Sequence, residues 1–248
     1  MKTTNNTVLI TGGSAGIGLA IAKTLAAQGN HVIITGRNKE RLENAAAQLN
    51  NVTPIVADVA SAVAVDALVS RISKEFPALN VVINNAGAAH YYQLGANVSA
   101  FDKAAEEIHT NYLSILALNE KLLPLLSKQA EAAIVNVSSI VAFVPARNIP
   151  TYAASKAALH SYTQILRYEL AQQQSPVKVF ELMPPLVNTD FSQAIGGANG
   201  IPPQQVADEL VQALAEDRFE IHVGGTAQLY QAFLQSPSDA LQYMNQAR

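Results

Sequence analysis

The sequence predicts a doubly wound α/β fold, in which helices cover both faces of a parallel sheet of about seven strands. Segments with strand and helix character alternate along the 248 residues. The strand segments are near-continuous apolar runs, as is typical of parallel strands buried on both faces. Hydrophobic residues make up 49% of the chain and charged residues 14%, so much apolar surface must be buried. We expect a single domain over residues 1–248, because the sequence shows neither a repeat nor a Ser/Gly-rich linker.

The strands are expected where short runs rich in β-branched residues lie between helical segments. They are predicted at Thr7–Ile10, His31–Thr35, Thr53–Ala57, Leu79–Asn84, Ala132–Ser138, Val177–Met183 and Glu220–Val223. The helices are predicted from apolar residues at helical spacing, at Leu19–Gly29, Lys39–Leu49, Ala60–Phe76, Ala100–Leu126 and Thr151–Gln173. Pro124 should bend or end the fourth of these helices, since proline removes a helical hydrogen bond.

Two segments are not assigned to strands or helices. Residues 184–203 contain four prolines and three glycines and are too long for an ordinary connection, so we expect them to form a lid over a site. Residues 236–248 are polar and lack clear periodicity. They are interpreted as an oligomer contact or a loose tail.

Composition excludes several classes of function. The net charge of −3, without a basic cluster, argues against a nucleic-acid partner. Cysteine is absent and the five histidines are scattered, so we expect no metal site. There is neither an apolar signal segment nor a run long enough to cross a membrane. We therefore expect a cytoplasmic protein.

A glycine-rich turn, Thr11–Gly18, lies between the first strand and the first helix. A strand that turns directly into a helix points the N–H groups of the helix start at whatever lies above the sheet edge. Glycines at 12, 16 and 18 would let the backbone approach a diphosphate closely. The turn therefore favours a dinucleotide-binding site.

A rival interpretation uses the same residues. Gly12 to Gly16 also fit the Gly-x-Ser-x-Gly elbow of α/β-hydrolases, with Ser14 as nucleophile and His222 as the late histidine that could act as base. Such an elbow usually follows an oxyanion loop, for which this chain has no room. The dinucleotide interpretation is preferred.

The end of the second strand bears on the type of cofactor. A turn that binds NAD usually carries an acid there to hold the ribose hydroxyls. Here the chain has Thr35-Gly36-Arg37-Asn38, and Arg37 could pair with a 2′-phosphate. The sequence thus favours NADP(H), with NAD(H) as the alternative.

Tyr152 and Lys156 begin a long helix at positions i and i+4, so their side chains share one helix face. A nearby ammonium should lower the pKa of a phenol towards neutral pH and make it a usable general acid or base. Ser139 follows the fifth strand. It should therefore lie at the same carboxyl edge as the glycine-rich turn, where ligands of doubly wound sheets bind.

Over nearly its full length the chain resembles the classical short-chain dehydrogenases/reductases, which share a Rossmann-type sheet. The matching pieces are Thr11–Gly18, Asp58, Asn84–Gly87, Asn111, Ser138–Ser139 and Tyr152–Lys156, in the family's order. The variant Pro184-Pro185, where the family typically has Pro-Gly, is similar to the DltE-like subgroup. A proline there must shape the turn differently, because it fixes φ and removes an N–H.

The resemblance implies an oxidoreductase that moves a hydride between a nicotinamide and a carbonyl or alcohol carbon. Tyr152 would donate the proton, Lys156 would hold the nicotinamide ribose, and Asn111 would support a water-linked relay. Substrate would be bound by Ser139, Val141, Tyr152 and Phe191. The cofactor would be bound by Gly12, Ser14, Gly16, Ile17, Gly18, Arg37, Asp58, Val59, Asn85, Ala86, Gly87, Tyr152, Lys156, Pro184, Val187 and Thr189.

The expected substrate is a small, moderately apolar carbonyl or alcohol compound, because the segments expected to line the pocket are mostly apolar. The long helices resemble those that pair subunits in the family, which implies a homodimer or homotetramer. A catalytically idle dinucleotide-binding sensor or scaffold is the alternative function. The presence of all four catalytic residue types argues against it.

Overall fold

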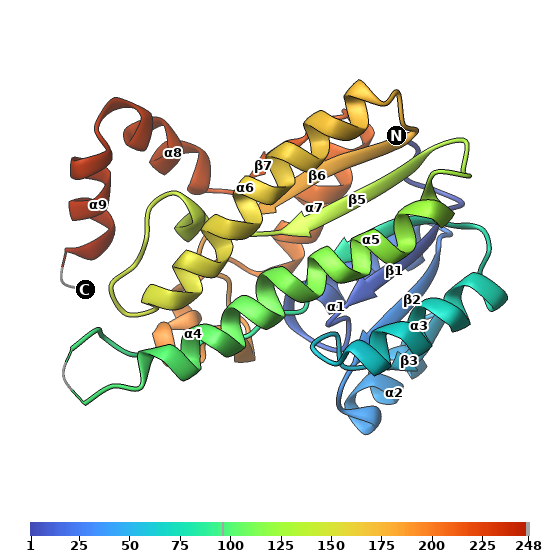
Figure 1. The fold of residues 1–248 in the computed structure, drawn as a ribbon, viewed down its shortest axis with the longest axis horizontal. Helices are drawn as coiled ribbons and strands as arrows, with labels where there is room; N and C mark the ends of the chain where they lie inside the picture. Colours follow the sequence, from blue (N-terminus) through green and yellow to red (C-terminus); the bar gives the residue numbers. More distant parts are fainter. Residues whose placement is uncertain (96, 247–248) are drawn as a thin grey trace.

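The computed structural model describes residues 1–95 and 97–246 and contains one parallel sheet of seven strands (Figure 1). The strand order is β3-β2-β1-β4-β5-β6-β7, and every neighbouring pair is parallel. The strands are β1 (Thr7–Thr11), β2 (His31–Gly36), β3 (Val52–Val56), β4 (Leu79–Asn84), β5 (Ala132–Val137), β6 (Val177–Met183) and β7 (Glu220–His222). The predicted fold class is confirmed.

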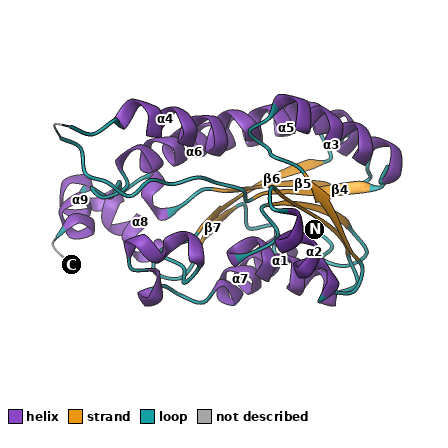
Figure 2. Ribbon diagram, turned by 90° about the horizontal axis from the view of Figure 1, so that it is seen from below, coloured by secondary structure: helices purple, strands orange, loops and turns teal. Residues whose placement is uncertain are grey.

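Helices cover both faces of the sheet (Figure 2). One layer holds α1 (Gly16–Ala27), α2 (Lys39–Ala47) and α7 (Pro203–Ala215). The other holds α3 (Ala62–Glu75), α4 (Ala100–Ile108), α5 (Ser114–Leu126) and α6 (Pro150–Gln172). Both faces of each central strand are therefore buried, which explains why the strands are continuously apolar.

The core is divided by the sheet into two clusters. In β1, Val8 and Ile10 pack with α1, α2 and α7, whereas Leu9 between them packs with the layer that holds α3 and α5. This alternation follows the two-residue period of a strand. Pro54 lies in β3, an edge strand, where the missing N–H costs no ladder bond to a central neighbour.

The long helix predicted at 100–126 is interrupted. A π-helical turn, His109–Leu113, separates α4 from α5. Such turns place an extra residue in the helix and frequently occur at functional sites. Pro124 does not end the helix at once, because α5 continues to Leu126.

Sequence reasoning missed three helices. α7 follows the proline-rich segment, and α8 (Thr226–Gln235) and α9 (Pro237–Asn245) follow β7. The segment expected as a contact or tail thus forms α9, which Ser236 caps by accepting from the Asp239 N–H at 3.4 Å. The Asn245 side chain bonds the Pro145 carbonyl and the Arg147 N–H. Residues 247 and 248 of the predicted tail lie outside the described residues.

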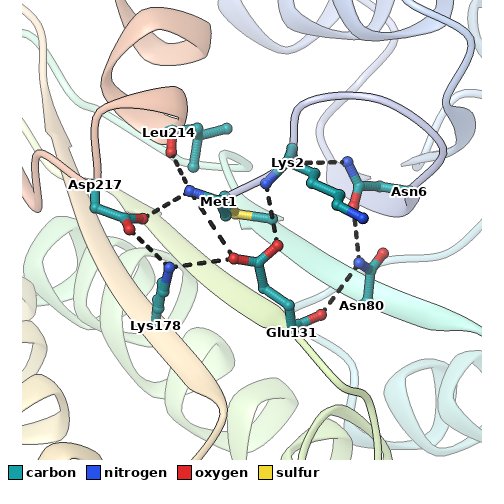
Figure 3. A network of polar contacts seen from close by, with 8 residues as sticks. All are labelled: Met1, Lys2, Asn6, Asn80, Glu131, Lys178, Leu214 and Asp217. Carbon is teal, nitrogen blue, oxygen red and sulfur yellow. Dashed lines mark hydrogen bonds and ion pairs between the residues drawn. The ribbon is translucent and has the colours of Figure 1, made fainter.

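The amino edge of the sheet carries a polar network (Figure 3). The Met1 amine donates to the Leu214 carbonyl at 2.7 Å and to Asp217 at 2.8 Å. Lys178, near the start of β6, bridges Asp217 at 2.8 Å and Glu131 at 3.2 Å. The network joins the chain start to the segments that precede β5 and β7. Among residues 1–95 and 97–246, no helix combines the length and apolar character that a membrane crossing requires.

Candidate active site

The predicted site residues come from the loops that follow β1 to β6, from the π-helical turn and from the start of α6. All strands are parallel, so these loops meet at one carboxyl edge of the sheet. The chain leaves β1 towards β2 on one side, whereas β4 lies on the other side of β1. This change in strand order opens the crevice in which doubly wound sheets bind their ligands.

The glycine-rich turn has a backbone that only glycine accommodates. Gly12 and Gly16 have φ values of +67° and +52°, which favour glycine. A Cβ at Gly18 would lie 2.4 Å from the Gly12 carbonyl oxygen, and one at Gly12 would lie 3.0 Å from the Ala86 Cα. The turn is therefore packed closely against the loop after β4. Because glycine has no side chain, the backbone on the outer side of the turn is not covered by the side chains of these residues.

The start of α1 can accept an anion. Ala15 precedes the helix, its side chain supplies no capping hydrogen bond within the described part of the chain, and the first turn has no acidic residue. The helix-start N–H groups and the positive end of the helix dipole are thus available to a diphosphate. Ile17 lies in this first turn. Ser14 lines a cavity of about 350 Å³ between α1 and α2, together with Asn38 and Arg41.

Thr11 and Asn85 join the turn to the loop after β4. The Thr11 hydroxyl oxygen accepts from the N–H groups of Asn85 and Ala86, each at 3.0 Å. The Asn85 amide in turn donates to the carbonyls of Thr11 at 3.0 Å and Gly12 at 3.1 Å. These bonds hold two neighbouring loops in a fixed relation, which is the property that a cofactor platform needs.

Asn111 lies in the π-helical turn and is fully buried. Its side chain accepts from the Ala88 N–H at 2.8 Å and donates to the Ala88 carbonyl at 2.8 Å and the Ser155 hydroxyl at 2.9 Å. Ser155 donates to the Tyr152 carbonyl at 2.7 Å. A Cβ at Gly87 would lie 3.1 Å from the Asn111 Oδ1. The π-turn thus connects the loop after β4 with the start of α6.

Ser139, Tyr152 and Lys156 come together at the end of β5. Ser139 follows the strand, and its Oγ accepts from the Val141 N–H at 3.3 Å. The Lys156 Nζ lies 5.6 Å from the centre of the Tyr152 ring and donates to the Val137 carbonyl at 2.8 Å. A phenol, a hydroxyl and a buried amine therefore share one small region.

The pKa of the Tyr152 phenol corrects one sequence-based expectation. Burial, reinforced by the negative charge of Glu107, raises this pKa above its ordinary value, and the Ser139 hydroxyl only partly offsets the effect. Burial lowers the pKa of Lys156 to about 8, while the charge of Glu181 opposes the change. The i, i+4 spacing placed the two groups close together, but it did not reveal how strongly the site excludes water.

Residues 184–203 lie against the site. Thr189 faces the glycine-rich turn, since a Cβ on Gly16 would lie 3.1 Å from its Cγ2. The Phe191 ring lies 6.2 Å from that of Tyr152, and Asp190 forms a 2.6 Å ion pair with Arg41 of α2. Nearer β6, the Pro184 carbonyl accepts from the Ile140 N–H at 3.0 Å, and Val187 is buried.

The region beside Tyr152 is apolar. Val141, Ile149 and Ala153 form a small buried cluster, against which Tyr152 and Ile195 pack. After β4, the Tyr92 hydroxyl bonds the Thr151 hydroxyl at 2.6 Å, and Tyr91 is 57% exposed.

The other cofactor candidates lie around the turn. Arg37 follows β2 and is exposed. Asp58 accepts from the Ala60 N–H at 3.0 Å, and Val59 lines a small void with Thr11 and Ala86.

Two buried acids near the site were missed by sequence reasoning. Glu107 of α4 accepts from the His90 N–H at 2.7 Å, and its second carboxylate oxygen has no partner among the described residues. Glu181 of β6 is fully buried and bonds Ser138 and His160. A lone acid inside an apolar strand was the signal that could have identified Glu181.

The geometry does not support a hydrolase. Ser14 follows β1, whereas His222 ends β7, four strands away in the sheet. At the usual strand spacing this is about 19 Å. His222 instead stacks on Tyr230, with ring centres 4.5 Å apart. Ser14 therefore lacks the base that the elbow interpretation requires.

Comparison with known proteins agrees with the geometry. A family model described as short chain dehydrogenase matches residues 6–200. The oxidoreductase DltE of Bacillus subtilis is 43% identical over 209 residues, which cover 84% of this chain and 82% of that protein. An oxidoreductase of Staphylococcus epidermidis is 34% identical over 219 residues, 87% of this chain and 93% of that protein.

Solved structures show the same fold. A short-chain dehydrogenase from Burkholderia cenocepacia in complex with NADP superposes with a TM-score of 0.86 at 26% identity, covering 100% of both chains. One from Burkholderia phymatum in complex with NAD has a TM-score of 0.88 at 21% identity and covers 100% of this chain and 98% of its own.

Proposed function

The chain belongs to the short-chain dehydrogenase family and is an NAD(P)-dependent oxidoreductase, and on this premise we propose that it reduces a small carbonyl compound with NADPH, using Tyr152 as the proton donor. The observation that carries the proposal is the meeting of Ser139, Tyr152 and Lys156 beside the glycine-rich turn. A dinucleotide on that turn and a carbonyl group near the phenol would share one crevice.

The residues around the turn fit a dinucleotide. A bare glycine backbone and an uncapped helix start suit a diphosphate, because they offer N–H donors without side chains in the way. The proposed holders are the glycine-rich turn, Asp58, Val59, Asn85–Gly87, Lys156, Pro184, Val187 and Thr189. When bound, the cofactor supplies the hydride, and the protein supplies placement and the proton.

The proton chemistry follows from burial. The raised pKa of Tyr152 keeps the phenol protonated at neutral pH, which suits a general acid in the direction of reduction. Ser139 is proposed to donate a hydrogen bond to the substrate oxygen. As that oxygen gains negative charge, the phenol releases its proton to it. Lys156 is proposed to favour the transfer by stabilising the developing phenolate.

Tyr152 must then be reprotonated. We propose that Asn111 supports a water-linked relay for this step. In support, its side chain is held from two sides, by Ala88 and by Ser155, within an irregular turn of the helix. The Asn111 amide also donates to the Ala88 carbonyl at 2.8 Å and so fixes its position, and this carbonyl is proposed as the acceptor that holds the relay water.

A preference for NADPH is proposed from the loop after β2. No acidic side chain stands at Thr35–Asn38, and the exposed Arg37 could pair with a 2′-phosphate. Ser14 and Asn38 line the neighbouring cavity and could add hydrogen bonds. NAD(H) remains the alternative cofactor.

A moderately apolar substrate is proposed because Val141, Ile149 and Ile195 surround Tyr152 with apolar surface. The segment 184–203 is proposed as its lid, within a single domain spanning the chain. In support, the lid contacts both the turn, through Thr189, and the phenol, through Phe191. Phe191 is 53% exposed and would be covered further by a bound substrate.

The assembly and location are proposed as well. Apolar side chains on α4, the π-helical turn and α6 are exposed, namely Phe101, Leu113, Ile165 and Tyr168, and this supports a homodimer or homotetramer. Sedimentation analysis tests it. A cytoplasmic location is proposed because nicotinamide cofactors are regenerated there, and cell fractionation tests it.

The function is tested by cofactor binding followed by a carbonyl screen. Titration should show tighter binding of NADPH than of NADH, and NADPH oxidation should depend on an added carbonyl compound. Arg37→Asp should erode the preference for NADPH, whereas the exposed Lys39→Asp serves as a charge-matched control. Unchanged selectivity in Arg37→Asp would refute the cofactor assignment. Cofactor binding without any turnover across the screen would favour the idle sensor.

A further inference from the structure

Glu181 is a carboxylate with no role in the proposed chemistry, yet it is completely buried behind the active site. It lies in the central part of β6, in a strand whose other residues near the carboxyl edge are apolar. A buried carboxylate strongly destabilises the fold unless hydrogen bonds or charges compensate it. The compensation must therefore come from its neighbours.

Two side chains hold the carboxylate. The Ser138 hydroxyl donates to Oε1 at 2.5 Å, and the His160 Nδ1 lies 3.0 Å from Oε1 and 2.9 Å from Oε2. Ser138 directly precedes Ser139. His160 follows Lys156 by one turn on the same face of α6. Both partners thus adjoin residues of the proposed catalytic group.

The surrounding charges come from two elements packed against β6. On α6 these are Lys156, His160 and Arg167, and on β7 they are Glu220 and His222. Arg167 pairs with Glu220 at 3.2 Å, so those two charges largely satisfy each other. Lys156 is only 3% exposed and forms no ion pair among the described residues. Glu181 is the carboxylate whose negative charge favours the ammonium form of Lys156.

We propose that Glu181 is a positioning residue for Lys156: a buried counter-charge, anchored by Ser138 and His160, that keeps the lysine in its ammonium form within the active site. The inference rests on the proposed function of Lys156. An ammonium in a water-poor site needs a nearby negative charge, because desolvation favours its neutral form. A carboxylate that faces α6, where it bonds His160, supplies that charge without competing for the cofactor or the substrate.

The protonation state of His160 determines how much of the negative charge of Glu181 acts on Lys156. The Glu181 hydrogen bond raises the pKa of His160, with burial acting against it. While His160 is protonated, it neutralises Glu181 and weakens the support of Lys156. Once His160 is neutral, it still donates one hydrogen bond and leaves the carboxylate charge for the lysine. The cluster therefore favours the ammonium form on the alkaline side of the His160 titration.

The test is the pH profile of NADPH-dependent reduction in Glu181→Gln. Glutamine keeps an acceptor for Ser138 and His160 but removes the charge. The alkaline limb, where Lys156 loses its proton, should move to lower pH by about one unit. Glu220→Gln is the matched control, because Glu220 is the register partner of Glu181 on β7 and pairs with Arg167. Its alkaline limb should stay at the wild-type position.

His160→Asn keeps the proposal testable if Glu181→Gln does not fold. It preserves a donor to the carboxylate and leaves the charge in place, so its alkaline limb should match that of the wild type. An acid shift in His160→Asn, or a wild-type limb in a folded Glu181→Gln, overturns the inference. Tyr152→Phe tests the proposed function separately. Full activity in Tyr152→Phe would refute the catalytic role of Tyr152, whatever the result for Glu181.

Discussion

The two edges of the sheet use the same kinds of side chain in opposite ways. At the amino edge, Lys178 and the Met1 amine pair with acids, and the Lys178 hydrogen bond lowers the pKa of Asp217, so the charged forms are favoured. At the carboxyl edge, burial raises the pKa of Tyr152 and lowers that of Lys156, so burial acts against the charged form of both groups.

The difference shows how one sheet separates stability from chemistry. Charges that are paired near the surface contribute to stability and titrate far from neutral pH. Groups held in a water-poor crevice reduce stability but hold protons that can be exchanged during a reaction. Variants at the two edges should therefore affect different measurements.

The largest effect is expected for Tyr152→Phe. Removing the phenolic proton should lower kcat/KM by about 10²–10⁴-fold, the usual contribution of a general acid. The free energy of unfolding should change by no more than about 1 kcal/mol, because the ring is retained and only the hydrogen bond to Ser139 is lost. Tyr243→Phe, on an exposed part of α9, is the control and should affect neither quantity. A large loss of stability in Tyr152→Phe would contradict the separation of the two edges.

Much of the site could be predicted from the sequence because its residues belong to local motifs. Tyr152 and Lys156 are four residues apart on one helix, and Gly12, Gly16 and Gly18 share one turn. Each motif follows a strand, so the parallel sheet brings them together at one edge. The fold class followed from the same alternation of strands and helices.

The remainder depends on contacts between distant residues. Glu181 meets His160 across 21 positions and Ser138 across 43, and neither separation leaves a pattern in the sequence. The pKa of Tyr152 was expected in the wrong direction because spacing reveals proximity but not burial. α7 could have been found, since Val206, Leu210 and Leu214 are buried at helical spacing.

The pH dependence of stability in Lys156→Met should reveal how much the buried lysine at the carboxyl edge destabilises the folded protein. A base whose pKa is lowered by folding binds fewer protons in the folded state, so the stability of the wild type rises with pH between about 8 and the ordinary lysine value of 10.5. The unfolding free energy of the wild type relative to that of Lys156→Met should rise by about 2 kcal/mol from pH 8 to 10. Denaturant unfolding at several pH values measures it. A constant difference would mean that Lys156 is not desolvated.

Lys178→Met tests the amino edge. The variant loses hydrogen-bonded ion pairs to Asp217 at 2.8 Å and Glu131 at 3.2 Å, and we expect a loss of about 1–2 kcal/mol in the free energy of unfolding. The value of kcat/KM should remain that of the wild type. Lys128→Met, at an exposed lysine before β5, should be nearly neutral in both measurements. If Lys178→Met instead had reduced activity and unchanged stability, the amino edge would serve the chemistry rather than the stability of the protein.

Asp217→Asn should give the smallest effect, and its sign is opposite to that of Lys156. An acid whose pKa is lowered by folding stabilises the protein above its ordinary value of 3.8, and this contribution disappears as pH falls through the folded pKa. Because the side chain is 41% exposed, the contribution should not exceed about 1 kcal/mol. Thermal unfolding should therefore show the wild type to be more stable than Asp217→Asn at pH 6, and the two proteins to be equally stable near pH 2. A gap that persists in acid would mean that Asp217 stabilises the edge through packing rather than charge.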